Sequence, residues 1–259
     1  MSDSTEPRAS DFVQSLARGF AVIRAFDAEH PALNLSEVAK RAEISPASAR
    51  RFLYTLEQMG YVRADGRQFT LAPRVLELGF SYLSALSLPE VMQPHLERLS
   101  RAVGESVSGA VLTDGDIVYI ARVPTRRIMS IGITIGTSFP AHATSMGRVL
   151  LASLDEQDAR ARVGEGPLRS FTNDTVTEVD ALLTQLAQVR QQGWAIVDGE
   201  LETELRSLAV PVNDKDGTVA AAINISTTVT RHSVERMREV LLPQALDTAR
   251  DIEAELKLL

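Results

Sequence analysis

Apolar residues recur at helical spacing in three segments near the start of the chain, residues 12–28, 37–42 and 46–59. Ser36 and Ser45 stand immediately before the second and third segments, where a hydroxyl can cap a helix N-terminus. The pattern predicts a short helix, a tight turn and a longer helix, with the first segment packed behind them. The apolar side of the first segment is formed by Leu16, Phe20, Ala21 and Ile23, and that of the third by Ala49, Phe52, Leu53 and Leu56.

Two short stretches with strand character follow, residues 61–63 and 68–71, on either side of a polar turn. The turn contains Asp65-Gly66, a dipeptide that favours a hairpin, and Gly60 ends the preceding helix. Two helices, a tight turn and a hairpin are the layout of a winged helix-turn-helix, which places its second helix in the major groove of duplex DNA. Helix pairs of this kind also occur in protein-interaction domains, so a role in dimerisation is the alternative.

The outward face of the segment 46–59 favours DNA binding over that alternative. It carries small, hydroxyl, guanidinium and phenol side chains, the groups that reach base edges and phosphates. Arginines flank the hairpin turn in the manner of a wing. The candidate DNA-contacting residues are Ser45, Ala47, Ser48, Arg50, Arg51, Tyr54, Thr55, Arg63 and Arg67.

The remainder of the chain mixes helical and strand patterns. Residues 73–87 predict a linker helix whose apolar surface is too broad for a solvated tether and suits contact with a second subunit. Helices are predicted at residues 89–103, 146–154, 179–192 and from Ser233 to near the C-terminus with a break around Pro243, and strands at 107–112, 117–123, 128–135, 194–198, 207–212 and 219–226. We therefore expect an α+β chain: a winged helix-turn-helix over residues 1–72 with a polar tail at 1–10, the linker helix over 73–87, and an antiparallel-rich sensor domain over 88–259.

Composition excludes several classes of protein. The chain has 259 residues and no cysteine, so disulfides and thiolate metal sites are excluded and a reducing cytoplasm is permitted. No apolar run is long enough to cross a bilayer, and the polar start lacks the apolar core of a signal peptide, so we expect a cytoplasmic protein with no membrane partner. Basic and acidic residues balance over residues 1–72, so the formal net charge of −7 belongs to the second part. A net-acidic chain can still bind DNA through a locally basic face.

The sequence contains no convincing catalytic constellation. The histidines are scattered, and none lies in a zinc-binding pattern. No phosphate-binding loop is present, and Ser145 lacks the preceding glycine that a nucleophile elbow requires. The carboxylates of residues 198–204 could act as a pair, but a charged loop is more often a solvated one. We therefore expect no enzyme, no metal and no cofactor; an enzyme acting on an organic acid is the lesser alternative.

Motifs along nearly the whole chain resemble those of the IclR family of bacterial transcriptional regulators. They are residues 15–20 with 22–23, 48–56 with 60–62, His-Ala-Thr-Ser-Met-Gly-Arg at 142–148, Gly-Trp-Ala at 193–195, and residues 198–202 and 208–212. Residues 12–19 are similar to the branch of this family that controls aromatic-acid catabolism through the β-ketoadipate pathway. The resemblance implies an N-terminal winged helix-turn-helix, a C-terminal effector-binding domain with a GAF-like fold, and dimers, often paired into tetramers, on palindromic operators.

The resemblance also implies an effector pocket walled by the sheet, by the loop before the helix of the His-Ala-Thr-Ser-Met-Gly motif, and by the strands at residues 205–210 and 222–226. Members of the family often have cysteine or serine at the positions of Ser207 and Asn224, which leaves room for a different ligand here. His142 suits ligand contact and a purely structural hydrogen bond equally. By position, the pocket residues are Ile128, Met129, His142, Ser145, Met146, Asp198, Leu205, Ser207, Asn224 and Ser226.

Apolar walls mixed with hydroxyl and amide groups suit a ligand with an apolar body and a few polar anchors. We therefore expect a small organic acid as the effector, an aromatic carboxylate or a product of its ring cleavage. Its carboxylate would need cationic or N–H donors, which Arg126, Arg127, Arg206 and the helix starting at Thr144 or Ser145 can offer. The alternative is that these arginines pair with surface carboxylates. The predicted function is a ligand-responsive DNA-binding regulator; a signalling domain with a dimerising helix-turn-helix is the alternative.

Overall fold

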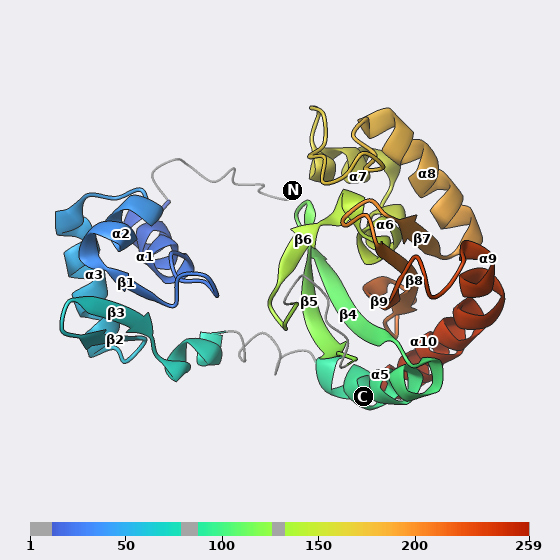
Figure 1. The fold of residues 1–259 in the computed structure, drawn as a ribbon, viewed down its shortest axis with the longest axis horizontal. Coiled ribbons are helices and arrows are strands. Elements are labelled where there is room, and N and C mark those ends of the chain that lie inside the picture. The colour runs from blue at the N-terminus through green and yellow to red at the C-terminus, as the bar shows by residue number, and fades with distance from the viewer. Residues whose placement is uncertain (1–11, 79–87, 126–132, 259) are drawn as a thin grey trace, which may run out of the picture. The chain divides into compact units, whose positions relative to one another are not determined.

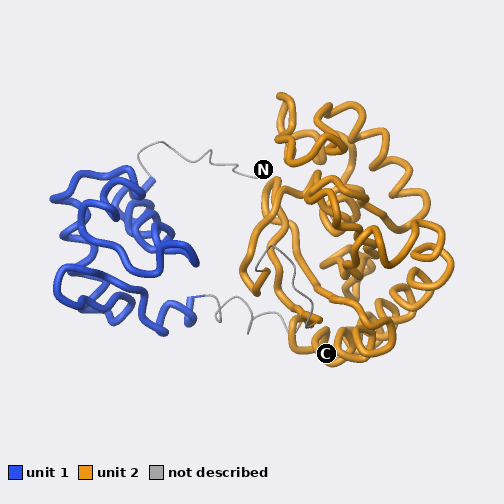
Figure 2. The backbone as a smooth tube through the Cα atoms, viewed as in Figure 1, with its two compact units in different colours: residues 1–82 blue, residues 83–259 orange. Residues whose placement is uncertain are grey.

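The computed structural model describes residues 12–78, 88–125 and 133–258 of the chain. The chain divides into two compact units, residues 1–82 and 83–259, and each is described by itself (Figures 1 and 2). Among the described residues, no helix is both long enough and apolar enough to cross a bilayer.

The first unit is a winged helix-turn-helix. Its helices are α1 (Gln14–Arg24), α2 (Leu35–Arg41) and α3 (Pro46–Gln58), and its strands are β1 (Ala32–Asn34), β2 (Val62–Asp65) and β3 (Gln68–Leu71). The strands form an antiparallel sheet in the order β1-β3-β2, so the predicted hairpin of β2 and β3 is extended by one short strand. Val38, Leu53 and Val62 lie in the common core of helices and sheet.

The two helices of the motif begin in different ways. Ser45 caps α3 as predicted: its Oγ accepts a hydrogen bond from the N–H of Ser48 at 3.2 Å. The predicted cap of α2, Ser36, is wrong. The cap is Asn34, whose Oδ1 accepts from the N–H groups of Ser36 and Glu37, while the Glu37 carboxylate accepts from the N–H of Asn34. This capping box lets strand β1 run directly into α2.

Helix α1 does not bury the side that its sequence pattern predicts. Leu16 and Phe20 are 60% and 46% exposed, whereas Val22, together with Ala25 and Phe26 just beyond the helix, is buried. The C-terminal part of α1 therefore supplies the packing against α2 and α3. Leu16 and Phe20 instead line an apolar groove between α1 and α3.

The second unit is a six-stranded antiparallel sheet with helices on both faces. The strands lie in the order β6-β5-β4-β9-β8-β7. They are β4 (Ser106–Thr113), β5 (Asp116–Val123), β6 (Ser138–Pro140), β7 (Ala195–Asp198), β8 (Leu205–Asn213) and β9 (Val219–Thr228). Helices α5 (Leu88–Val103) and α10 (Leu242–Leu256) cover one face, and α6 (Ser145–Ala152), α7 (Glu156–Val163) and α8 (Val179–Gln192) lie on the other (Figure 1).

Strand alternation divides this unit into two cores. Val107 and Ile225 pack with α5 and α10, whereas Ala110, Ala209 and Ala222 pack with α6. Methyl side chains at these three positions allow the α6 backbone to lie close to the sheet. We call the side of the sheet that carries them the α6 face.

The turn before α6 is equally tight. Residues Ala141–Ala143 form a 3-10 turn, and Thr144 caps α6 by accepting the N–H of Gly147 at 3.0 Å. A Cβ at Gly147 would lie 2.1 Å from the carbonyl oxygen of Ala141. Only glycine fits there, which fixes the start of α6 against the turn.

Several predicted elements differ from the structure. The strand that pairs with the edge of β5 is β6, which comes later in the chain than the predicted strand 128–135. Residues 133–135 are not a strand, and the rest of the predicted strand lies outside the described residues. The predicted linker helix 73–87 is described only at its start, where Pro73–Val75 is a 3-10 turn and residues 76–78 are helical. The predicted break near Pro243 is present, because Ser233 caps a short helix, α9 (Val234–Arg236), which passes through a π-helical turn before α10.

Candidate DNA-reading helix and effector site

The predicted DNA-contacting residues lie on the solvent-facing surface of α3, with its N-cap, and of the β2–β3 hairpin. The apolar stripe of α3 is turned inward, with Ala49, Leu53 and Leu56 buried. Because α3 has 3.6 residues per turn, this burial turns the opposite side of the helix to solvent. Ser48 is half-buried, and the exposed residues are Ser45, Ala47, Arg50, Arg51, Tyr54, Thr55, Arg63 and Arg67.

The arginines on this surface are not used internally. Within the described part of the chain, no carboxylate forms an ion pair with Arg50, Arg51, Arg63 or Arg67. By contrast, Arg41 on α2 donates to Asp27 and to a backbone carbonyl, so it serves the fold. Four unpaired guanidinium groups on α3 and the hairpin form a surface that suits a polyanion.

Two hydroxyl groups on the same surface already have partners. Ser45 Oγ donates to Ser48 Oγ at 3.0 Å, in addition to its role as the N-cap. Thr55 Oγ1 donates to the carbonyl of Arg51 at 2.9 Å. A hydroxyl oxygen keeps acceptor capacity in such a bond, so both groups can still accept one from DNA.

In the second unit, two rows of polar residues cross the α6 face, each row running over hydrogen-bonded strands. We call these six residues the polar rows. Alternation along each strand places them on the same side as Ala110, Ala209 and Ala222. The first row is Arg122, Ser108 and Asn224, and the second is Ser106, Ser226 and Ser207.

Some polar atoms of this region are buried without a hydrogen-bond partner among the described residues. They are Arg122 Nε and Asn224 Oδ1 in the polar rows and Ser145 Oγ at the start of α6. Asn224 uses its other group, since Nδ2 donates to Ser226 Oγ at 3.0 Å. Buried polar groups in native proteins are nearly always paired, so a cluster of unpaired ones indicates a place where a polar ligand or water completes the set.

The remaining predicted effector residues have diverse surroundings. Met146 is fully buried in the core beneath α6, and Leu205 is half-buried at the start of β8. Both oxygens of Asp198 accept from Arg206, at 2.8 and 2.6 Å, so the expected alternative of an arginine paired with a carboxylate holds for Arg206. Ile128 and Met129, together with the proposed donors Arg126 and Arg127, lie outside the described residues.

His142 has a structural partner. Its Nε2 donates to the carbonyl of Arg169 at 2.9 Å, and its ring lies beside that of Phe171. Burial lowers the pKa of His142 below its ordinary value, partly opposed by this hydrogen bond. His142 is therefore neutral at pH 7 and holds the turn before α6 to the loop around Arg169.

A buried ion pair holds α6 from its other side. Arg148 Nη2 donates to Glu200 Oε2 at 2.5 Å, and both residues are buried. Arg148 Nε donates to the carbonyl of His142, and Glu200 Oε2 also accepts the N–H of Val176 at 3.1 Å. Burial lowers the pKa of Arg148, and the nearby Glu200 carboxylate opposes this effect. The pair ties α6 to the loop that follows β7.

Comparison with known proteins agrees with both units. Residues 15–66 match the IclR helix-turn-helix domain, and residues 80–254 match the C-terminal domain of the bacterial transcriptional regulator IclR. The chain belongs to the IclR family. It is therefore a DNA-binding transcriptional regulator, and the predicted order of a winged helix-turn-helix followed by an α/β domain is confirmed.

Curated IclR-family relatives match nearly the full length of the chain. The Pca regulon regulatory protein of Pseudomonas putida is 43% identical over 93% of this chain and 84% of its own length. The p-hydroxybenzoate hydroxylase transcriptional activator of Acinetobacter baylyi is 35% identical over 96% of this chain and 94% of its own length. The predicted resemblance of the sequence to the branch that controls aromatic catabolism is thus confirmed.

Solved structures of the family have the same fold. A transcriptional regulator described from Rhodococcus sp. RHA1 is 51% identical, with a TM-score of 0.84 over 95% of this chain and 99% of its own. An IclR homologue from Microbacterium hydrocarbonoxydans, in complex with 4-hydroxybenzoate, is 26% identical, with a TM-score of 0.83 over 95% of this chain and all of its own.

Three residues of the polar rows, Arg122, Ser108 and Ser106, were not among the predicted site residues of this IclR-family chain, although they occupy the α6 face. Arg122 and Ser108 are neighbours across β5 and β4, and Arg122 Nη1 donates to Ser108 Oγ at 3.2 Å. A signal was present in the sequence, because a charged residue near the end of a strand that is otherwise apolar needs a partner if that strand is buried.

Proposed function

We propose that this chain regulates genes of aromatic-acid catabolism by binding a hydroxylated aromatic carboxylate, or a product of its ring cleavage, on the α6 face of the second unit. The observation that carries the proposal is the group of buried, unpaired polar atoms at Ser145, Asn224 and Arg122, set against an apolar core. That combination suits a flat acid with a hydroxyl group. The similarity to regulators named for the Pca regulon and for p-hydroxybenzoate hydroxylase supports the same ligand class.

Calorimetric titration of the purified chain tests the ligand class. The acids are 4-hydroxybenzoate, protocatechuate and β-ketoadipate. At least one is expected to bind, and Ser207→Leu, which fills the second polar row, is expected to abolish that binding. Thr184→Leu makes a similar change on the exposed side of α8 and is expected to bind like wild type. The absence of binding by all three acids would contradict the proposed ligand class.

For DNA, the proposal assigns base reading to α3 and phosphate contact to the hairpin arginines. Loss of a base-reading arginine is expected to cost about 1–3 kcal/mol of binding free energy. The test is fluorescence anisotropy with a promoter fragment that the wild-type chain binds, using Arg50→Ala, Arg51→Ala and Arg67→Ala. Arg101→Ala, in α5, is the control, since Arg101 is exposed and remote in sequence from the first unit. Wild-type affinity in both α3 variants would show that α3 is not the reader.

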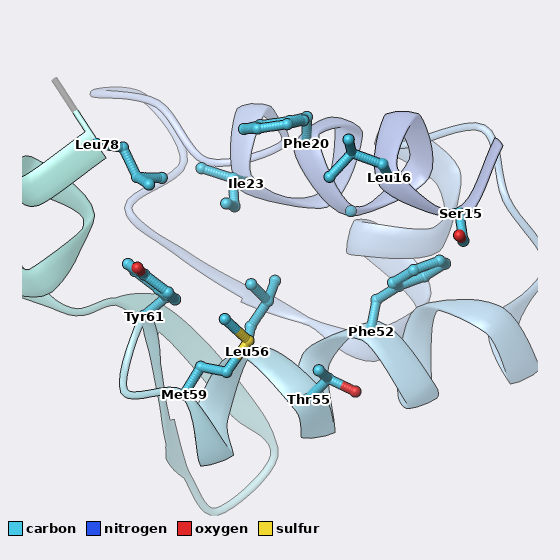
Figure 3. A pocket seen from close by; sticks show the side chains of 11 residues that line it. Ser15, Leu16, Phe20, Ile23, Phe52, Thr55, Leu56, Met59, Tyr61 and Leu78 are labelled. Carbon is cyan, nitrogen blue, oxygen red and sulfur yellow. The ribbon is translucent and has the colours of Figure 1, made fainter. Parts of the chain in front are cut away.

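The proposal includes a homodimer, because one reading helix covers only one half of a palindromic operator. The apolar groove between α1 and α3 is the contact that we propose for the second copy, with tetramers as a further step of assembly. It encloses about 260 Å³, and Figure 3 shows Leu16, Phe20 and Ile23 of α1 across from Phe52 and Leu56 of α3. Monomers would leave this apolar surface in water. As a DNA-bound regulator, the protein would act in the cytoplasm.

Light scattering at micromolar concentration tests this contact. Phe20→Glu places a carboxylate in the groove and is expected to yield monomers that bind the promoter fragment weakly. Phe12→Glu makes the same change at a residue that is 69% exposed and does not line the groove, and is expected to leave the mass unchanged. A wild-type chain that is monomeric at this concentration would overturn the proposal.

A further inference from the structure

Among the described residues of the second unit, Arg122 is a half-buried cation for which no ion pair with a carboxylate is formed. The other described arginines of this unit that are buried or half-buried have carboxylate partners: Arg148 pairs with Glu200, Arg160 with Asp180 and Arg206 with Asp198. Among the described residues, Arg122 has only one hydrogen bond, from Nη1 to Ser108 Oγ, and its Nε is buried without a partner. A guanidinium with a buried, unsatisfied N–H is costly unless an acceptor completes it.

The position of Arg122 directs its guanidinium to the α6 face. It lies opposite Ser108, which in turn lies opposite Asn224, so the three form the first polar row. Burial lowers the pKa of Arg122, and the nearby Tyr119 hydroxyl opposes this effect. Tyr119 is itself buried, which raises its pKa to about 12, so it stays neutral and offers no counter-charge at pH 7.

We propose that Arg122 is the residue that binds the carboxylate of the effector and thereby selects acids over neutral aromatic compounds. The inference rests on the proposed function, since it assumes that the effector occupies the α6 face. The guanidinium offers Nε and an Nη in the planar fork that matches a carboxylate. Ser108 holds the other Nη, so the fork is oriented before the ligand arrives. The unpaired Asn224 Oδ1, on the other side of Ser108 in the same polar row, accepts a hydrogen bond from a ligand hydroxyl.

The proposal makes two predictions that a merely structural arginine would not meet. The first concerns selectivity: a charge-assisted hydrogen bond to Arg122 strengthens binding only of a ligand that carries a negative charge. The second is stability without ligand. Because a half-buried cation with an unpaired, buried Nε does not favour folding, Arg122→Gln is expected to leave the unfolding midpoint of the free chain unchanged or raised.

The test is calorimetric titration of the full chain with 4-hydroxybenzoate and with 4-hydroxybenzamide, a neutral compound of the same shape. If wild type responds instead to protocatechuate or β-ketoadipate, that acid and its amide are the pair. Arg122→Gln is expected to weaken binding of the acid by roughly 10- to 100-fold, the range of a charge-assisted hydrogen-bonded pair, and to leave binding of the amide nearly unchanged. Arg122→Lys keeps the charge without the fork and is expected to be intermediate.

Two further variants serve as controls. Ser108→Ala removes only the hydroxyl that orients the guanidinium. It is expected to weaken binding of the acid less than Arg122→Gln does. Arg160→Gln, in α7, removes a half-buried arginine that pairs with Asp180 and lies outside the polar rows, and it is expected to bind both compounds like wild type. Suppose that the acid binds wild type, and that Arg122→Gln either weakens binding of acid and amide equally or weakens binding of neither. The assignment of Arg122 is then overturned, while the proposed function stands. If none of the three acids binds wild type, the ligand class fails and the assignment with it.

Discussion

Replacing Glu200 by Gln removes one charge from the buried ion pair that holds α6 to the loop after β7. Gln keeps the size of the side chain and one acceptor oxygen, so the hydrogen bonds from Arg148 and Val176 are only partly lost. The main change is that the Arg148 guanidinium is left as a buried cation without a counter-ion. The substitution therefore tests the effect of the charge on stability while the shape of the side chain stays almost the same.

The size of the effect follows from burial. Arg148 is 5% exposed and Glu200 7% exposed, so water cannot solvate the charge that remains. Removing one partner of a buried pair costs about 3–5 kcal/mol. In a cooperative unit of 150–250 residues, 1 kcal/mol shifts the unfolding midpoint by about 2–4 °C, so Glu200→Gln is expected to lower it by roughly 6–20 °C.

Differential scanning calorimetry of the full chain measures this shift. Asp180→Asn breaks the exposed pair with Arg160, in which Asp180 is 86% exposed, and is expected to leave the midpoint unchanged. The double variant Arg148→Met/Glu200→Gln removes both charges and is expected to be less destabilised than Glu200→Gln alone. The reasoning is refuted if Glu200→Gln behaves like Asp180→Asn, or if the double variant is the less stable of the two.

The remaining predictions concern single sites. Gly147→Ala is expected to prevent stable folding of the second unit, judged by circular dichroism, because the new Cβ would meet the carbonyl of Ala141 at 2.1 Å. Asn34→Ala is expected to cost about 1 kcal/mol in urea unfolding through loss of the cap, whereas Ser36→Ala is expected to have little effect. The pKa of His142 is lowered in the folded state, so its stabilising contribution is complete above about pH 6.5 and is lost as the pH falls through the folded pKa; His142→Gln is expected to flatten that decline.

Long segments with strong local signals were predicted well. The bounds predicted for residues 179–192 are those of α8, because apolar spacing marks the helix and Gly193, with a φ of 81°, ends it. The hairpin of β4 and β5 was equally clear from its turn, in which Asp114 has a φ of 54°. In such segments the residues that decide the structure lie within one or two turns of each other.

Short elements could not be predicted because their partners are remote in sequence. Strand β1 has three residues and exists by pairing with β3, more than thirty positions later. The cap of α2 was misassigned for the same reason: Ser36 has the right chemistry, but β1 ends at Asn34 and the helix begins there. Strand β6 likewise depends on the edge of β5.

The candidate site shows the same limit at the level of side chains. Alternation along one strand tells which residues share a face, but only the pairing of strands shows that Arg122, Ser108 and Asn224 are neighbours. The family motifs identified Ser145 and Asn224, because these lie in recognisable stretches. Arg122 lies outside those stretches, and its one signal, a charge in an otherwise apolar strand, does not show which residues lie next to it.

In the described part of the chain, exposed apolar residues and a half-buried charge without a counter-ion occur at the two contacts that we propose for binding partners. Leu16 and Phe20 are apolar and exposed, and Arg122 is charged and half-buried without a counter-ion. Each exception costs stability in the isolated chain, and a partner that binds only the folded state offsets that cost by mass action. A second copy would do so for the first unit and an anionic effector for the second. Because a ligand regulates only through different affinities for two states, the proposed contact of the effector carboxylate with Arg122 can alter DNA binding only if it is stronger in one of them.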